Sequence, residues 1–337
     1  MKILSVESSC DETSLAILED GYKLLGHLVA SQVEIHNQYG GVVPEVASRQ
    51  HFSTILPLLE ELLKQTGIDI DQIDYIAVTR GPGLMGALII GNMFARTLSE
   101  LYTIPLIGVN HVLAHSFVNF INPTGPEAWP DFPTLSLVVS GAHTDIQFID
   151  QNLKHELMGA TRDDAAGEAF DKVARLIGFG YPGGAKLSRI AVEGDSQVYQ
   201  LPKARLGRDS LEFSFSGLKT AVLRLVTELK DSGQWNDQTR KDLAASFEKN
   251  VVDTIVDKFE LAYERTDPAS IILGGGVMAN TRLREQLVKR FSDHAKVFLP
   301  DRSLCTDNAA MIGALAYQMI KHKIPVKLEI DSSLEEI

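Results

Sequence analysis

The sequence predicts an α/β protein of two domains, each with a partly parallel sheet, and three observations support this fold class. The chain has 337 residues, which is more than one hydrophobic core usually organises. Residues 75–109 read as a strand, a glycine-rich turn, a helix from about Met85 to about Leu101 and another strand, which is a βαβ unit with parallel strands. Strand–turn–strand patterns occur at both 2–18 and 134–149. We therefore expect two related halves.

The remaining elements follow the same pattern. Residues 268–291 contain a buried strand, three consecutive glycines and a helix, which repeats the strand–turn–helix order of the first half. The proline-rich segment 121–133 is predicted to link the halves. We expect a first domain of residues 1–125, onto which a C-terminal helix within 308–330 packs, and a second domain of residues 126–307.

Composition indicates a folded protein of a reducing compartment. Hydrophobic residues make up 45% of the chain and charged residues 23%, and neither a signal peptide nor a membrane-spanning segment is expected. Cys10 and Cys305 are too few for a disulfide framework, so the expected location is the cytoplasm. The net charge of −12 disfavours broad binding to nucleic acid. A nucleic-acid substrate would need a local basic patch or a basic partner.

His111 and His115 are four residues apart in the segment VNHVLAHSF. On a helix this spacing places both imidazoles on one face, which suits a zinc or iron ion. Two ligands do not complete a site, and the pair is equally compatible with ordinary core or surface histidines. The peptidase pattern H-E-x-x-H is absent, because Val112 stands where that pattern has its glutamate.

Asp307 is the candidate for a third ligand, because it is a carboxylate directly before an apolar helix in LCTDNAAMIGA. The same position suits the N-cap of that helix, and the spacing by itself favours the N-cap.

Two glycine-rich segments, 79–88 and 273–280, are either tight turns or phosphate-binding loops. Together with the two serine-containing hairpins they favour several turns that cradle phosphate, with a nucleotide or an acyl-adenylate as ligand. Residues 161–184 are predicted to form an amphipathic helix that ends in a Gly/Pro turn, with Asp163, Asp164, Glu168 and Asp171 in its first half. Early acidic side chains usually complement the helix dipole or face solvent. Asp171 lies late for that role, so we expect it to contact a ligand.

Seven motifs resemble one family. In chain order they are ESSCDET, NHVLAH, VSGAHT, DDAAGEAFDK, YPGG, LGGGVMAN and CTDNAAMI, and they resemble the TsaD family (also YgjD or Gcp) from about residue 3 to about residue 320. The resemblance implies the actin, Hsp70 and sugar-kinase (ASKHA) fold with duplicated βββαβα halves. It also implies a tRNA N6-adenosine threonylcarbamoyltransferase. Such an enzyme moves threonylcarbamoyl from threonylcarbamoyl-AMP to N6 of adenosine-37 in tRNAs that read ANN codons, and releases AMP.

The resemblance further implies the residues of the site. His111, His115 and Asp307 are expected to hold one Fe²⁺ or Zn²⁺ ion per subunit, and catalysis would depend on that metal. The residues expected to bind threonylcarbamoyl-AMP, or a nucleotide of the ATP or ADP type, are Val138, Val139, Ser140, Gly141, Ala142, Asp171, Gly184 and Asn280. Ala142 replaces a glycine that is usual in the family. This would cost about 1 kcal/mol or more if the position had a positive φ.

The mechanism is expected to need no covalent enzyme intermediate, since neither a Ser-His-Asp nor a Cys-His arrangement is evident. A bound metal would act as a Lewis acid on the carbamoyl carbonyl or on a phosphate oxygen. His143 is either an oxyanion donor or a structural histidine of its turn. A catalytic role for Glu12 is equally open.

The resemblance implies tRNA as substrate and three protein partners: the inactive ASKHA paralogue TsaB, the ATPase TsaE and the adenylate-producing enzyme TsaC/Sua. We expect TsaB to dock on the helices around 48–65 or 84–101, with a homodimer as the alternative when the chain is alone. The predicted local basic sites for tRNA are Lys203, Arg205 and Arg208, or Arg282 and Arg284.

Three other functions compete with this one. A small-molecule kinase of the same architecture would use a carboxylate base and magnesium and would have no use for the histidine pair. A non-catalytic ATP-binding module would bind nucleotide without depending on His111. A metallo-endopeptidase would need a glutamate in place of Val112.

Overall fold

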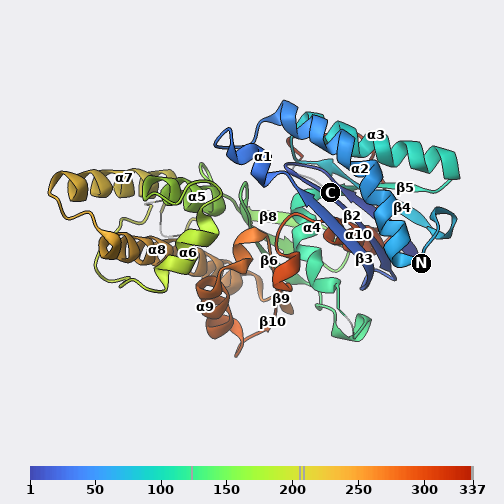
Figure 1. Ribbon diagram of the computed structural model, residues 1–337. Helices are drawn as coiled ribbons and strands as arrows, with labels where there is room; N and C mark the ends of the chain where they lie inside the picture. Colours follow the sequence, from blue (N-terminus) through green and yellow to red (C-terminus); the bar gives the residue numbers. More distant parts are fainter. Residues whose placement is uncertain (123, 205, 208, 335–337) are drawn as a thin grey trace. The chain divides into compact units, whose positions relative to one another are not determined.

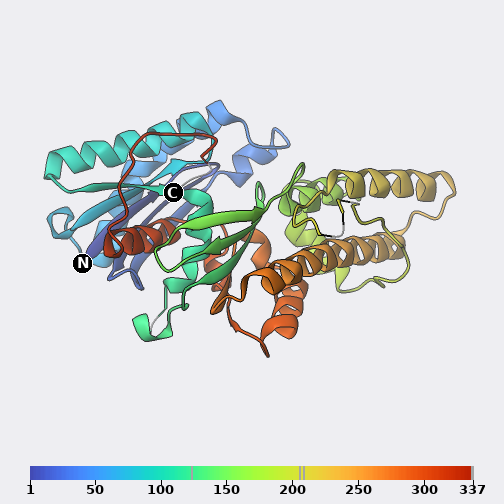
Figure 2. The same cartoon turned by 180° about the vertical axis from the view of Figure 1, so that it is seen from behind.

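The computed structural model describes residues 1–122, 124–204, 206–207 and 209–334, and the chain packs as two compact units (Figures 1 and 2). Unit 1 consists of Met1–Asp131, Asp150–His155 and Pro300–Ile337, and unit 2 of Phe132–Ile149 and Glu156–Leu299. The boundaries predicted after residues 125 and 307 concern domains as folding units and stay a prediction. Among the described helices, none is long and apolar enough to cross a membrane.

Unit 1 is built on a five-stranded sheet in the order β3-β2-β1-β4-β5. The pairs β1–β2 and β2–β3 are antiparallel, whereas β1–β4 and β4–β5 are parallel. The parallel pairs require crossovers, and these contain helices, as in any βαβ unit. The strands are β1 (Lys2–Glu7), β2 (Glu12–Glu19), β3 (Lys23–Ser31), β4 (Tyr75–Gly81) and β5 (Leu106–Asn110).

Helices cover both faces of this sheet (Figures 1 and 2). Leu4 and Val6 of β1 belong to a hydrophobic core with residues of α2 and α3. Ser5, which points to the opposite face, lies against Gly313 of α10. Because both faces are covered, the strands β1 and β4 are almost continuously buried. The helices of unit 1 are α1 (Val33–Asn37), α2 (Pro44–Thr66), α3 (Met85–Tyr102), α4 (His111–Phe117) and α10 (Ala309–Lys321).

Unit 2 repeats the topology of unit 1. Its sheet has the order β10-β9-β6-β7-β8, with β6–β7 antiparallel and β6–β9 and β9–β10 parallel. Strands β6 to β8 thus correspond to β1 to β3, and β9 and β10 to β4 and β5, which confirms the predicted duplication. The strands are β6 (Thr134–Val139), β7 (Thr144–Ile149), β8 (His155–Gly159), β9 (Ser270–Gly274) and β10 (Lys296–Phe298).

The halves differ in their inserted helices. Within the described part of the chain, four α-helices lie between β8 and β9 in the sequence, and one lies between β9 and β10. They are α5 (Ala166–Leu176), α6 (Gly184–Ala191), α7 (Ser216–Asp231), α8 (Asp237–Thr266) and α9 (Thr281–Phe291).

The helix predicted within 161–184 is present as α5 and is followed by the predicted Gly/Pro turn, but it begins at Ala166, after Asp163 and Asp164. Asp163 lies before α5 and accepts hydrogen bonds from the backbone N–H groups of Phe215 and Ser216 at the start of α7, as an N-terminal cap does. Asp164 accepts bonds from the ammonium groups of Lys172 and Lys219. Asp163 and Asp164 therefore hold neighbouring elements in place, whereas Glu168 lies in the first turn of α5.

Candidate metal centre and nucleotide-binding residues

The histidine pair lies where β5 ends and α4 begins. The side-chain carbonyl of Asn110 accepts a hydrogen bond of 3.0 Å from the backbone N–H of Leu113, so Asn110 caps the helix and α4 starts at His111. His111 and His115 consequently lie one turn apart, as the spacing predicts. Both side chains are buried.

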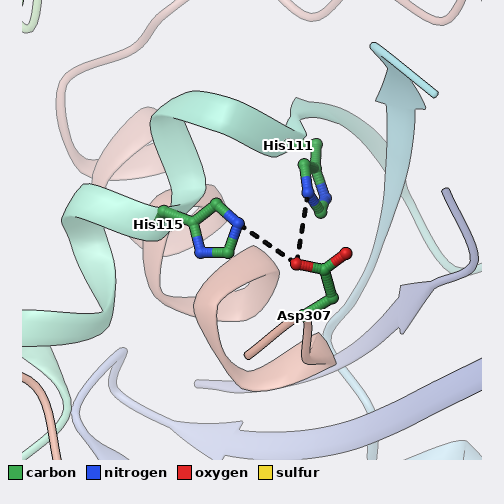
Figure 3. A group of neighbouring side chains, drawn as sticks. All are labelled: His111, His115 and Asp307. Carbon is green, nitrogen blue, oxygen red and sulfur yellow. Dashed lines mark ion pairs between the residues drawn. The ribbon is translucent and has the colours of Figure 1, made fainter. Parts of the chain in front are cut away.

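Asp307 faces these two rings. Its Oδ1 atom lies 3.2 Å from Nε2 of His115 and 3.6 Å from Nε2 of His111 (Figure 3). The N-cap of α10 is instead Asn308, whose Oδ1 accepts a bond of 3.0 Å from the backbone N–H of Met311. The N-cap interpretation of Asp307 is therefore wrong, and its carboxylate is available to the histidines. The three potential ligand atoms lie within 4.8 Å of one another.

The environment of the rings fits a cation. Among the described residues, neither ring nitrogen of His115 makes a hydrogen bond, and Nε2 has only its ion-pair contact with Asp307. Burial of a polar nitrogen without a hydrogen bond costs free energy. Burial lowers the pKa of His111, but the charges of Glu7 and Asp307 outweigh it and raise that pKa to about 9, so this cluster retains a proton when no metal is bound. Two imidazole nitrogens and one carboxylate oxygen form a donor set suited to zinc or iron.

Glu7 is a functional candidate that the sequence analysis missed. Its Oε2 accepts a hydrogen bond of 2.9 Å from Nδ1 of His111 and one from the hydroxyl of Thr79, while Oε1 accepts a bond of 2.6 Å from the backbone N–H of Ser9. Burial raises the pKa of Glu7, but the interaction with His111 outweighs it and leaves the pKa below its usual value. A carboxylate behind a metal-ligating histidine fixes which ring nitrogen is free to bind. The sequence signal that could have identified Glu7 is an acidic residue at the end of the apolar strand KILSVE.

Glu12 and His143 lie in different units. Glu12 begins β2, and burial together with the neighbouring carboxylates of Asp307 and Asp11 raises its pKa to about 9. Such crowding of carboxylates favours a bound cation. His143 is half-buried in the β6–β7 turn of unit 2, where its backbone N–H donates to Ser140 Oγ at 3.0 Å.

The β6–β7 turn contains the first group of predicted nucleotide-binding residues. Val138 and Val139 are fully buried in β6, whereas Gly141 and Ala142 are exposed. The hydroxyl of Ser140 accepts a bond from the backbone N–H of Ala142 at 3.3 Å. Ala142 is not among the residues with a positive φ, so alanine in place of glycine causes no backbone strain.

The other three predicted residues meet around α6. Oδ1 of Asp171 accepts bonds of 2.9 and 2.7 Å from the backbone N–H groups of Gly183 and Gly184, where α6 begins. One turn later, Ser188 Oγ lies 2.9 Å from Nδ2 of Asn280.

Asn280 is itself fully engaged. Its Nδ2 also donates to Oε1 of the buried Glu248 at 2.6 Å, and its Oδ1 accepts from the backbone N–H of Leu283 as the cap of α9. These hydrogen bonds fix the end of the 273–280 turn. Gly275 of that turn has a φ of 92°, and a Cβ atom there would overlap the backbone of Val139.

The other glycine-rich turn, 79–88, has a different role from the phosphate cradle that the sequence suggested. The backbone N–H of Gly83 donates to the carbonyl of Ser332, and the backbone N–H of Asp331 donates to the carbonyl of Arg80. A Cβ atom on Gly81 would overlap the carbonyl of Asp331. The chain's own C-terminal segment therefore fills this turn.

The predicted basic sites are in part already engaged. Lys203 forms an ion pair of 2.7 Å with Asp257, and Arg284 donates to the carbonyl of Met278 at 3.1 Å. The guanidinium Nε of Arg282 is buried. Arg205 and Arg208 lie outside the described residues.

Fold and site together define the class of this protein: a two-unit α/β protein of the actin, Hsp70 and sugar-kinase type, with a cluster of side chains in its first unit that could hold a metal ion. The structure of HypF in its phosphate- and nucleotide-bound form has a TM-score of 0.63 at 15% identity, covering 95% of this chain and 56% of that one. Component A of the (R)-2-hydroxyglutaryl-CoA dehydratase of Acidaminococcus fermentans has a TM-score of 0.51 at 11% identity, covering 96% and 99%. These similarities show the fold.

The sequence profile of the TsaD family, described as tRNA N6-adenosine threonylcarbamoyltransferase, matches residues 23–314. The enzyme of that name from Caldicellulosiruptor saccharolyticus is 46% identical over 318 residues, which are 94% of this chain and 92% of that one. The one from Symbiobacterium thermophilum is 45% identical, covering 98% and 95%. The chain therefore belongs to the TsaD family of transferases.

Proposed function

We propose that this chain synthesises threonylcarbamoyladenosine in tRNA. It transfers the threonylcarbamoyl group from threonylcarbamoyl-AMP to N6 of adenosine-37 in tRNAs that read ANN codons, and AMP leaves. Membership of the TsaD family supports the activity and tRNA as the substrate class. The observation that carries the mechanism is the cluster of His111, His115 and Asp307.

In this proposal the three side chains hold one Fe²⁺ or Zn²⁺ ion. When bound, the metal supplies Lewis-acid stabilisation for the charge that develops on the carbamoyl carbonyl or a phosphate oxygen. Glu7 accepts the Nδ1 proton of His111, which leaves Nε2 as the ligand atom. One ring nitrogen of His115 and the carboxylate of Asp307 complete the donor set.

The residues of unit 2 would bind the adenylate, or an ATP or ADP nucleotide. Val138, Val139, Ser140, Gly141 and Ala142 supply the β6–β7 turn, in which the exposed Gly141 and Ala142 can face a ligand. Asp171, Gly184 and Asn280 act around α6. Because the hydrogen-bonding atoms of Asn280 are occupied by Glu248, Ser188 and Leu283, we assign Asn280 to shaping the site.

His143 and Glu12 remain candidates for further catalytic roles. His143 would donate a hydrogen bond to the developing oxyanion, which its place beside the exposed end of the β6–β7 turn supports. Glu12 would act beside Asp307.

The partner surface is proposed on α2 and α3. Large apolar side chains on these two helices are exposed, Phe52 by 74% and Met93 by 57%, together with Leu56, Met85 and Ile89. They lie at helical spacings, and Gly86 of α3 lies against Ser48 of α2, so the side chains form one patch. A patch of this kind suits the paralogue TsaB, or a second copy of this chain when TsaB is absent. TsaE and TsaC/Sua would complete the pathway in the cytoplasm.

The tRNA site and the domain boundaries are further proposals. Lys203 and Arg284 can contribute to tRNA binding only where tRNA phosphates replace the partners that these side chains have now. The folding units are proposed as 1–125 with 308–330, and 126–307, which limited proteolysis followed by mass spectrometry would test.

The decisive experiment is mass spectrometry of tRNA nucleosides from cells depleted of this protein and rescued with wild type or with His111→Ala/His115→Ala. We expect threonylcarbamoyladenosine to disappear on depletion and to return only with wild type. If threonylcarbamoyladenosine also returns with the double variant, the proposed role of the metal is wrong. An unchanged nucleoside level on depletion, in cells with no second copy of the gene, would remove the transferase activity.

A further inference from the structure

The turn between β1 and β2 is held by the two helices that carry the exposed apolar patch. The carbonyl of Ser9 accepts a hydrogen bond of 2.8 Å from the backbone N–H of Leu84, the cap residue of α3. The carbonyl of the next residue, Cys10, lies 3.0 Å from Nε2 of His51 in α2. Consecutive peptide groups of the turn are thus fixed from two helices.

The same turn holds the histidine of the metal cluster. The backbone N–H of Ser9 donates to Oε1 of Glu7, and Oε2 of Glu7 accepts the Nδ1 proton of His111. The hydroxyl oxygen of Ser9 also lies 3.2 Å from Nδ1 of His111. A displacement of the backbone at Ser9 and Cys10 would therefore move the Ser9 N–H, which holds Glu7, and the Ser9 hydroxyl, which lies beside His111.

The orientation of the His51 ring is fixed by its own partners. A carbonyl can only accept, so Nε2 carries the proton and donates it to Cys10. Burial lowers the pKa of His51, so the ring is neutral and Nδ1 is an acceptor. Thr13 Oγ1, 2.8 Å from Nδ1, donates to it. A ring rotated by 180° about χ2 would lose both bonds within a fully buried site, which is costly.

A chain of buried side chains extends from His51 to the start of α2. The amide nitrogen of Gln32 donates to the carbonyl of Ala47 and lies 3.5 Å from Nδ1 of His51. Its amide oxygen lies 3.1 Å from Nε2 of His36, which donates to it. The backbone N–H of Val43, the residue before α2, donates to Nδ1 of His36. These hydrogen bonds fix which atoms of Gln32 and His36 donate and which accept, so the side chains form one connected network.

We propose that His51 is a positioning residue of the metal centre, which sets the orientation of His111 through the backbone of Cys10 and Ser9 and through Glu7. This inference rests on the proposed metal function. His51 is too far along the hydrogen-bond chain to bind the metal, and it acts through Cys10, Ser9 and Glu7. Phe52, the most exposed apolar side chain of the patch, directly follows His51. A partner that docks on the patch therefore contacts the same turn of α2.

The test uses the complete chain loaded with Co²⁺, whose visible absorption bands report ligand geometry. The variants are His51→Leu, which removes both hydrogen bonds, and His51→Gln, whose amide nitrogen can still donate to Cys10. Leu59→Ala is the matched control, because Leu59 is a buried residue of the same helix that packs in the core. Tm is measured for each variant, and kcat and KM for tRNA are measured with the partner proteins present.

We expect His51→Leu to shift the Co²⁺ bands and to lower kcat about tenfold, the low end for groups behind a metal ligand, with KM for tRNA unchanged. In His51→Gln, the Co²⁺ bands and kcat should stay close to those of wild type. Unshifted bands in His51→Leu, an equal shift in Leu59→Ala, or a glutamine variant that behaves like the leucine variant would each overturn the proposal.

Two additional variants keep the test decisive. If His51→Leu does not fold, Thr13→Val removes the Thr13 hydrogen bond to Nδ1 of His51. We then expect the Co²⁺ bands to shift from those of wild type, and unshifted bands would overturn the proposal. His111→Ala/His115→Ala should abolish the Co²⁺ bands. If the bands are unchanged in this double variant, both the metal function and the positioning role of His51 are wrong. If the bands change in the double variant but not in His51→Leu, only the positioning role is wrong.

Discussion

The hairpin turns of the two units occupy equivalent places in their sheets but differ in their surroundings. The β1–β2 turn is held by α2, α3 and Glu7 and supports His111. In the β6–β7 turn, Gly141 and Ala142 are exposed, and Ser140 holds the turn together. Among the described residues, the one group of side chains that could hold a metal ion lies in unit 1. The duplicated scaffold therefore provides the turn, and the elements packed around each turn decide its chemistry.

Buried carboxyl groups show the same difference. In unit 1, Glu7 is buried beside His111, which keeps its pKa below the usual value. In unit 2, burial raises the pKa of Asp145 on β7 from 3.8 to about 7, and only a hydrogen bond from Thr144 opposes it. The first carboxylate is thus stabilised as an anion beside His111. The second is a stability cost that depends on pH.

The largest expected effect comes from removing the ligands in unit 1. In the triple variant His111→Ala/His115→Ala/Asp307→Ala, metal content should fall to background and transferase activity at least about a thousandfold, or about 4 kcal/mol in activation free energy. Plasma mass spectrometry of the purified chain measures the metal. The control variant Asp171→Asn in unit 2 should keep its metal. A triple variant with the metal content of wild type would contradict the assignment of His111, His115 and Asp307 as ligands.

Asp145→Asn should alter the pH dependence of stability. Because the folded chain holds this proton between about pH 4 and 7 while the unfolded chain releases it, the free energy of unfolding of wild type falls as pH rises through that window. The variant should lack this loss and be more stable above pH 7 by up to about 4 kcal/mol, with little difference near pH 4. Urea unfolding at several pH values measures this. Asp293→Asn at an exposed site is the control, and a variant with the slope of wild type would refute the prediction.

Glu7→Gln should weaken metal binding by about ten- to a hundredfold, because the neutral amide no longer holds the charge and tautomer of His111. Competition with a chelator measures the dissociation constant. The matched control is Glu248→Gln, which also changes a buried carboxyl but in unit 2. Equal metal affinity in the two variants would mean that Glu7 does not orient a ligand.

The smallest effect is expected for Ala142→Gly, which restores the glycine usual in the family. Since Ala142 has no positive φ, glycine relieves no strain and adds conformational freedom to the unfolded chain. Stability should fall by less than about 1 kcal/mol, measured by urea unfolding. A clear gain in stability would show that the turn is strained by alanine.

The local features of the site could be read from the sequence. The hairpin at 2–18, the βαβ unit and the one-turn spacing of His111 and His115 depend on periods of two and of 3.6 residues, which the backbone fixes. The seven family motifs added the expected roles of Asp307, Asp171 and Gly184. The spacing alone could not settle Asp307, because Asp and Asn are equally good caps and only packing selected Asn308.

The sequence by itself thus determined the duplicated α/β fold, the histidine pair and the family. Tertiary structure decided which residues meet: Glu7 behind His111, Asp307 in front of both histidines, His51 on the β1–β2 turn and the C-terminal segment in the 79–88 turn. These contacts join residues far apart in the chain. They follow from strand order and from the packing of α2, α3 and α10 on the sheet, and no local periodicity encodes them.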